Sequence, residues 1–296
     1  MRRFFFSEIR RNDLLSIALI TFFLTFFMGI AFVFGYFMGF WLTGVVFIVM
    51  LLVIAYEYYY SDRIVLRHFK ARPANMRDLD EAEFQHAVEE MAIAAGLPTP
   101  KAYVIDDPAP NAFATGRNPE HAVICATTGL LKMMDKDEVL GVVGHEMGHV
   151  KNKDTKIMTL AAVMAGTIVA LAFLFRNAAF YGGLGRNRDS GQAVLIVLLA
   201  ALIASIVAPI FAAMIKAVIS RKREFMADAT SAMLTRYPEG LARALEKIAG
   251  YKKPMKNANT GNAHLFIANP LGSVNLKGVF STHPPIEERI KRLREM

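Results

Sequence analysis

The N-terminal part of the chain holds a long stretch without any charged residue, from position 14 to position 56. A helix through the whole stretch would be about 64 Å long, roughly twice the thickness of the hydrocarbon layer of a bilayer. We therefore expect two membrane spans, at residues 14–34 and 37–56, with a tight turn at Gly35. The length and apolarity of the stretch argue against a buried hairpin of a soluble protein and against a cleaved signal peptide.

Two more uncharged runs lie later in the chain, at residues 157–175 and 190–215, and Pro209 interrupts the second. They predict a second transmembrane hairpin, although a partly membrane-buried hairpin or helices buried in protein would fit the same runs. The whole chain is 54% hydrophobic, which is more apolar than soluble domains usually are. The predicted organisation has four parts: a basic N-terminal tail with a hairpin at 1–56, a cytoplasmic part at 57–156, the second hairpin at 157–215, and a second cytoplasmic part at 216–296.

The formal net charge of +8 comes from Lys and Arg residues that cluster beside the apolar runs. Cytoplasmic loops of membrane proteins carry such an excess, so we expect a multi-pass protein of the cell membrane with both termini and the parts at 57–156 and 216–296 in the cytoplasm. Three arginines between the third and fourth runs, Arg176, Arg186 and Arg188, run mildly against this orientation. The sequence holds no nucleic-acid-binding motif and no phosphate-binding loop, so we expect neither a nucleic-acid partner nor a nucleotide.

The chain has a single cysteine, Cys125, which excludes an internal disulfide and a zinc site built from cysteines. This cysteine usage suits a domain in a reducing compartment. Cys125 lies in a short apolar run and is expected to be a core residue.

The segment His145-Glu146-Met147-Gly148-His149 has the pattern HExxH within a helix-forming stretch. Two histidines four residues apart lie on one face of a helix, at a spacing that one Zn²⁺ can bridge. Glu146 lies beside them, where it can act as the general base of a hydrolase. A surface helix with two ordinary histidines is the alternative, but the preceding run 138–144 is largely apolar and predicts a buried helix. Buried ionisable groups need a partner, and a metal ion is one.

A catalytic zinc site needs a third protein ligand, and Glu224 is the best candidate. Asp228 lies four residues later on the same helix face, where it can accept a hydrogen bond from a ligating histidine and set its tautomer. The same segment would also suit a solvated charged helix with local Arg–Glu pairs. If the third and fourth runs form an antiparallel hairpin, the chain returns to its starting side, and Glu224 can meet His149 close to the membrane surface.

The remaining segments predict a small mixed domain. Residues 76–95 have helical periodicity, and an amphipathic helix is expected beyond residue 229. Short strands are expected at 102–105, 112–115 and 122–125, because turn signals separate these apolar segments.

Four separated segments resemble the HtpX-like family: HEMGH at 145–149, SRKREFMADA at 220–229, PNAFATG at 110–116 and THPP at 282–285. Hydrophobic hairpins at the start and in the middle of the chain agree with this resemblance. HtpX-like proteins are integral-membrane zinc metallopeptidases related to the CAAX prenyl endopeptidases. The resemblance implies a mostly α membrane protein with a small β-sheet, in which a gluzincin-like zinc metallopeptidase core is joined to transmembrane helical hairpins.

For the site, the resemblance implies one Zn²⁺ per chain, with His145, His149 and Glu224 as ligands and Glu146 as catalytic base. It also implies that residues 111–116 form an edge strand that binds substrate, through Asn111, Ala112, Phe113 and Ala114. An extended peptide can add to such an edge by main-chain hydrogen bonds, whereas an ordinary hairpin edge would have the same sequence pattern.

The resemblance also draws attention to His283 and Arg289. We expect His283 to donate a hydrogen bond to the tetrahedral oxyanion, and Arg289 to support that charge from the following helix. A helix-capping loop histidine is the alternative, because two prolines follow His283 and end any earlier helix.

The expected function is therefore that of a membrane-embedded zinc endopeptidase that cleaves membrane or misfolded proteins, in quality control and the stress response. Its expected partners are protein or peptide substrates, chiefly membrane proteins, and the lipid bilayer. A CAAX-type prenyl protease shares the motif, but four candidate spans give no evident enclosing chamber. A non-enzymatic membrane adapter is the other alternative, and the intact Glu146 argues against it.

Overall fold

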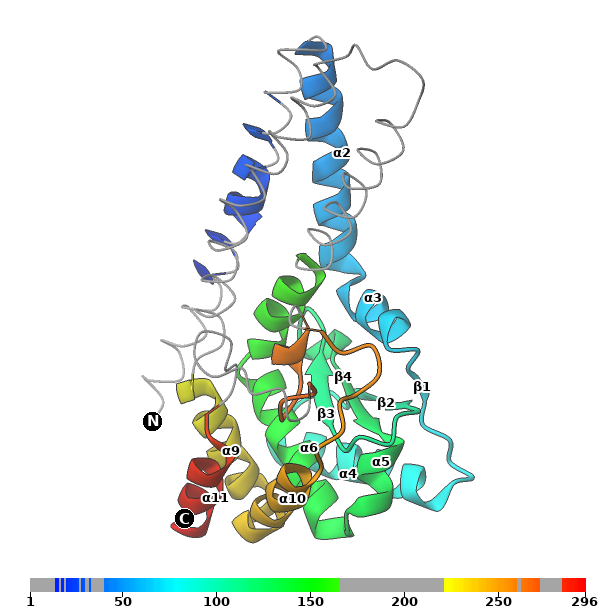
Figure 1. Cartoon of the computed structure of the whole chain (residues 1–296), viewed down its shortest axis with the longest axis vertical. Coiled ribbons are helices and arrows are strands. Elements are labelled where there is room, and N and C mark those ends of the chain that lie inside the picture. Colours follow the sequence, from blue (N-terminus) through cyan, green and yellow to red (C-terminus); the bar gives the residue numbers. More distant parts are fainter. Residues whose placement is uncertain are drawn as a thin grey trace.

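The structure is a computed structural model that describes residues 40–164, 221–259, 262–271 and 284–296, with short stretches between 14 and 32. Helix α2 (Phe40–Tyr59) extends away from a part that holds the β-sheet and the other labelled helices (Figure 1). Across the described residues, no helix meets the length and hydropathy expected of a membrane span. The predicted run 190–215 lies outside the described residues, as does 165–175 of the third run.

The β-sheet has four strands in the order β1-β2-β4-β3: β1 (Arg72–Pro73), β2 (Lys101–Ile105), β3 (Ala112–Thr115) and β4 (Val123–Thr127). Strands β2 and β4 are parallel, and the two outer pairings are antiparallel. Strand β3 therefore lies at one edge of the sheet, as the family resemblance implies. The three predicted strands are present, and β2 and β4 each differ from their predicted bounds by one or two residues.

Both faces of the sheet are buried. Alternate residues of each strand point to opposite sides, and each side faces a hydrophobic cluster. Ile124 and Ala126 of β4 face one hydrophobic cluster, whereas Val123 and Cys125 face another. The first cluster lies under α4 (Leu79–Ala95), α5 (Thr128–Met133), α6 (Lys136–Lys151) and α10 (Pro238–Gly250). The second lies under α3 (Ser61–His68), the start of the helical stretch at 154–164 and the segment around the short helix η2 (Ala263–Leu265). Cys125 is a buried core residue, as expected.

Helix α6 runs through the middle of this arrangement and carries the HExxH segment (Figure 1). Its first turn is closed by a capping box, in which Asp135 accepts from the Glu138 backbone and Glu138 accepts from the Asp135 backbone. Two further helices complete the described part, α9 (Arg221–Thr235) and α11 (Ile286–Arg294), and the short helix η1 (Pro119–His121) joins β3 to β4. Helices α9 and α10 thus return to pack against α6, and α11 packs against both of them.

The close approach of α6 to its neighbours depends on glycines that share one face of the helix. A Cβ atom at position 141 would lie 2.5 Å from the backbone nitrogen of Leu241 on α10. A Cβ at position 148 would lie 3.1 Å from the Cα of Ala227 on α9. Without these glycines α9 and α10 would have to move away from α6, and α9 carries Glu224.

We expect Gly141→Ala to lower the free energy of unfolding by about 1–3 kcal/mol, because the added methyl group collides with backbone that has no rotamer to adopt. Gly250→Ala is the matched control, since nothing lies within 4 Å of a Cβ there. Thermal unfolding of the two variants should show a lowered Tm for Gly141→Ala alone. Equal Tm values for both variants would contradict this account of the packing.

Candidate metal centre

Three buried side chains converge at the contact between α6 and α9: His145, His149 and Glu224. One ligand atom from each lies within 4.8 Å of the others. The Nε2 atoms of the two histidines are 3.2 Å apart, and Glu224 places its Oε1 3.6 Å from the Nε2 of His149. These are the three residues that the sequence predicts as metal ligands, and the structure brings them together.

The helix contact itself explains how residues so distant in sequence meet. Ser231 of α9 donates a hydrogen bond of 2.6 Å from its Oγ to the carbonyl of Gly141. Gly144 leaves the space in which the Ser231 side chain lies. This contact aligns the first turns of α9 with the last turns of α6, and Glu224 then faces the two histidines.

The tautomers of the two histidines follow from their carboxylate partners. The Nδ1 of His145 lies 2.9 Å from Asp228 Oδ1, and the Nδ1 of His149 lies 3.2 Å from Asp154 Oδ2. A carboxylate accepts a hydrogen bond from the protonated ring nitrogen, so in a neutral ring the Nδ1 carries the proton and the Nε2 keeps the lone pair. When both rings are neutral, the two lone pairs face each other at 3.2 Å and repel, and a metal ion or a proton between them removes that repulsion.

This donor set suits Zn²⁺, which binds two imidazole nitrogens and a carboxylate oxygen in many hydrolases and keeps one position open. The residues present therefore fit the metal that the HExxH pattern predicts.

Asp228 is held by a buried arginine as well as by His145. Arg289 of α11 donates from Nη2 to Asp228 Oδ1 at 2.7 Å and from Nε to Oδ2 at 2.9 Å, a bidentate pair. Burial alone would raise the pKa of Asp228, but the charge of Arg289 and the hydrogen bond of His145 hold it below its usual value. Asp228 stays ionised, which its predicted role as acceptor for His145 requires.

Arg289 is 1% exposed and also donates a hydrogen bond of 2.8 Å from Nη1 to the carbonyl of Ile267. Its Nη1 is 3.6 Å from Glu224 Oε2, so the guanidinium lies beside the metal group. Its expected support of an oxyanion stays a prediction. His283 falls outside the described residues, and its expected hydrogen bond to the oxyanion also stays a prediction.

Glu146 points from α6 toward β3 and is 1% exposed. Burial raises the pKa of Glu146 to about 7, although the nearby His149 and a hydrogen bond from the backbone of Ala114 oppose the shift. A carboxylate with a pKa near neutrality can both take and return a proton at physiological pH. This environment suits the predicted role of Glu146 as general base.

The two histidines have opposite surroundings. Burial and then the charge of Arg289 lower the pKa of His145 to about 4. Burial would also lower the pKa of His149, but the hydrogen bond of Asp154 and the charge of Glu224 raise it to about 9. His149 therefore lies in the more negative surroundings, which favour a cation at this position, whether a proton or a metal ion.

The outer edge of β3 is already paired with another part of the chain. Ile267 donates a backbone hydrogen bond of 2.9 Å to the carbonyl of Ala112, and Phe113 forms an antiparallel bridge with Phe266. The side chain of Asn111 donates a hydrogen bond of 3.0 Å from Nδ2 to the carbonyl of Ala268. Ala114 of the predicted substrate residues contacts Glu146 through its backbone, but residues 266–268 occupy the edge that a peptide would use.

Sequence reasoning missed Asp154 and Ile267 as neighbours of this site. Asp154 lies five residues beyond His149, a spacing that places two residues on different faces of a continuous helix. Ile267 lies in an Asn-rich stretch without strand periodicity. The only sequence signal for Asp154 is that it is an acidic residue shortly after the HExxH segment.

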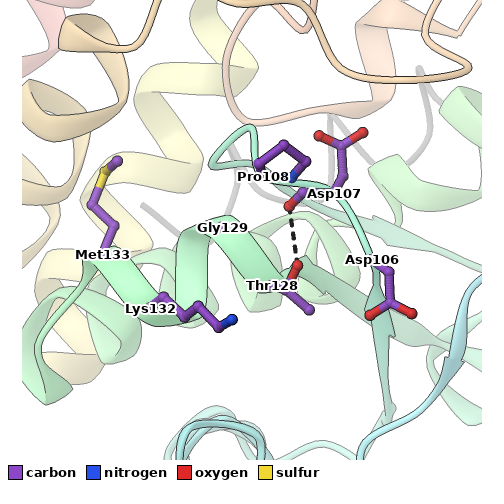
Figure 2. A pocket seen from close by; sticks show the side chains of 7 residues that line it. All are labelled: Asp106, Asp107, Pro108, Thr128, Gly129, Lys132 and Met133. Atoms are coloured by element: carbon purple, nitrogen blue, oxygen red, sulfur yellow. Dashed lines mark hydrogen bonds between the residues drawn. The ribbon is translucent and has the colours of Figure 1, made fainter.

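A separate hollow lies between the loop that follows β2 and helix α5 (Figure 2). It is lined by Asp106, Asp107, Pro108, Thr128, Gly129, Lys132 and Met133. The hydroxyl of Thr128 donates to the carbonyl of Asp107 across it, at 3.2 Å. It contains none of the metal-group residues, so the chemistry lies elsewhere.

Comparison with known proteins agrees with this geometry. The model of "Peptidase family M48" matches residues 78–296, which include the metal group and β3. The chain belongs to peptidase family M48. As a member of that family it is a metalloprotease, and the converging His145, His149 and Glu224 form its candidate metal centre.

Two similar proteins match almost the whole chain. A "Protease HtpX homolog" from Caldanaerobacter subterraneus subsp. tengcongensis is 47% identical, with 93% of each chain covered. Another from Thermoanaerobacter pseudethanolicus is 44% identical, again with 93% of each chain covered. The crystal structure of S. mikatae Ste24p has a TM-score of 0.52 at 20% identity, and the match covers 97% of this chain and 67% of that one. At this identity the likeness to Ste24p shows a shared fold alone.

Proposed function

We propose that this M48 metalloprotease is a zinc endopeptidase that holds one Zn²⁺ on His145, His149 and Glu224. The observation that carries the proposal is the pair of Nε2 atoms 3.2 Å apart, each with its Nδ1 against a carboxylate. When bound, zinc supplies a Lewis acid and a site at which water becomes a nucleophile near neutral pH.

The residues of the chain then have distinct tasks. The carboxylate of Glu146 takes a proton from the attacking water and passes one to the leaving amine. The backbone of Ala114 holds that carboxylate from the side of β3. Asp228 and Arg289 keep the His145 ring in one orientation and one tautomer. These side chains and the three metal-group residues are buried, so bulk water does not reach the side chains that surround the metal position.

Glu146→Gln should abolish peptide cleavage, with a loss of several orders of magnitude in kcat, because the amide cannot accept a proton. The variant should still bind one zinc per chain, measured by metal analysis of the purified protein. Glu224→Ala should lose both the metal and the activity. Near-normal turnover by Glu146→Gln would rule out this mechanism, and normal zinc content in Glu224→Ala would place the third ligand elsewhere.

For substrate binding we propose that an extended peptide adds to the outer edge of β3, at Asn111, Ala112, Phe113 and Ala114. The backbone of Ala114 donates a hydrogen bond to Glu146, which supports the proposal. Because Ile267 already donates to the Ala112 carbonyl, addition of a peptide there requires residues 266–268 to separate from β3. Main-chain pairing would make selectivity for side chains broad.

Hydrogen exchange can test this binding mode in the Glu146→Gln variant, which should bind peptide without cleaving it. The amide of Ile267 should be protected in the free protein, and a saturating unstructured peptide should make residues 262–271 exchange faster. Peptides from α4, which lies on the opposite side of the sheet from η2, should be unchanged and serve as the internal control. Unaltered protection at 262–271 with peptide demonstrably bound would count against addition at this edge.

We further propose that the enzyme is a multi-pass membrane protein whose catalytic side faces the cytoplasm, where it removes misfolded or membrane proteins. The uncharged runs and the Lys and Arg beside them support this placement. The relatives at 44–47% identity are named as proteases and the likeness to Ste24p is one of fold, so a prenyl-protease function gains no specific support.

The orientation can be tested by cysteine labelling in a variant that lacks Cys125. Ile93 is 80% exposed on α4, so a cysteine there is reachable from its own side of the membrane. In intact cells an impermeant thiol reagent should fail to label Ile93→Cys and should label Gly35→Cys at the predicted outer turn. Labelling of Ile93→Cys without permeabilisation would reverse the proposed orientation.

A further inference from the structure

The two metal-facing histidines are supported in the same way from opposite sides. His145 is backed by Asp228, which is in turn paired with the buried Arg289. His149 is backed by Asp154, whose other oxygen, Oδ1, lies 3.5 Å from Nε of Arg223. The first set follows from the motif on α9, whereas nothing in the HExxH pattern accounts for the second.

Asp154 is as deeply buried as the metal ligands. It is 1% exposed, and Arg223 is 3% exposed. A buried carboxylate is costly unless it is paired and hydrogen-bonded. Its two oxygens divide between the His149 ring on α6 and the Arg223 guanidinium on α9, so the side chain joins the two helices that supply the metal ligands.

The backbone is bent at the point that this contact requires. Helix α6 ends at Lys151, and Lys153 has a φ of 57°, in the left-handed region that residues other than glycine seldom adopt. A new helical stretch starts at residue 154. In an unbroken helix Asp154 would lie about 140° around the axis from His149, too far to reach its ring. The turn at Lys153 brings Asp154 back toward the His149 ring.

We propose that Asp154 is a positioning residue for the metal site: it accepts the Nδ1–H of His149, orients the ring and directs its Nε2 toward the ion, while Arg223 holds the carboxylate from α9. Because Arg223 is adjacent to Glu224 in the chain, the same contact couples the orientation of His149 to the helix that carries the third ligand. The inference rests on the proposed zinc site and adds to it a residue outside the HExxH segment and the Glu224–Asp228 pair.

The test measures zinc affinity directly, by competition with a chromophoric chelator on the full-length chain in detergent. Asp154→Ala should raise the Kd for Zn²⁺ by about 10–100-fold, the usual effect of removing such a hydrogen-bond partner. Asp154→Asn should lie between Asp154→Ala and the parent, because its amide oxygen can still accept from Nδ1. The Co²⁺-loaded protein should also change its visible absorption spectrum, since the His149 ring is no longer held.

Asp107→Asn is the matched control. Asp107 is 2% exposed and accepts from the backbone N–H groups of Ala109 and Lys256, so it is an equally buried aspartate without a metal ligand as partner. That variant should lose thermal stability but keep the parent Kd and cobalt spectrum. A merely structural role for Asp154 predicts the same behaviour in Asp154→Ala.

The proposal is overturned if Asp154→Ala folds and its Kd stays within about threefold of the parent, well short of the usual effect. If Asp154→Ala does not fold, Asp154→Asn decides, and an unchanged Kd with an unchanged cobalt spectrum overturns the proposal. Failure of the parent protein to bind zinc would instead refute the proposed function, so the two ideas fail on different measurements.

Discussion

The contact between α6 and α9 is the interaction on which the rest of the site depends. It is close because glycines at positions 141, 144 and 148 share one face of α6 and leave room for α10, Ser231 and Ala227. His145 follows Gly144 and His149 follows Gly148. Each histidine therefore lies one residue further around the helix than its glycine, on the side of the candidate metal position. The glycines that permit packing and the histidines of the candidate metal centre therefore follow one helical register.

The buried aspartates of this site are neutralised by paired arginines and not by solvent. Asp228 is compensated by Arg289, and Asp154 by Arg223, all of them buried. Neutral pairs behind each imidazole can orient it without adding a large net charge at the ion. The remaining negative charges are Glu224, which faces the metal position, and Glu146, whose raised pKa reflects that burial. Removal of one member of a buried pair leaves its partner uncompensated, so these residues act as sets.

The sequence predicts the parts of this site that follow local periodicity. The i, i+4 spacing of His145 and His149 and of Glu224 and Asp228 holds within α6 and α9, and β3 lies at the edge expected of it. Departures occur where a non-local or strained feature decides. Asp154 reaches His149 only because the backbone of Lys153 adopts a left-handed conformation, which local sequence propensity does not predict. Leu79, at the start of α4, is 87% exposed because it lies five residues, about 140° around the helix, from the buried Phe84.

Because residues 266–268 pair with β3, a polypeptide that binds at this edge must compete with a segment of the same chain. A strand tethered to the same chain competes at an effective concentration in the millimolar range, whereas free polypeptides in solution are far more dilute. Folded proteins, whose backbone is already paired, cannot displace it. Chains with long unpaired segments held close by a shared surface can, because tethering raises their own local concentration to a comparable level. The choice between substrates would then depend on how long a polypeptide stays extended near the site, and hardly at all on its side chains.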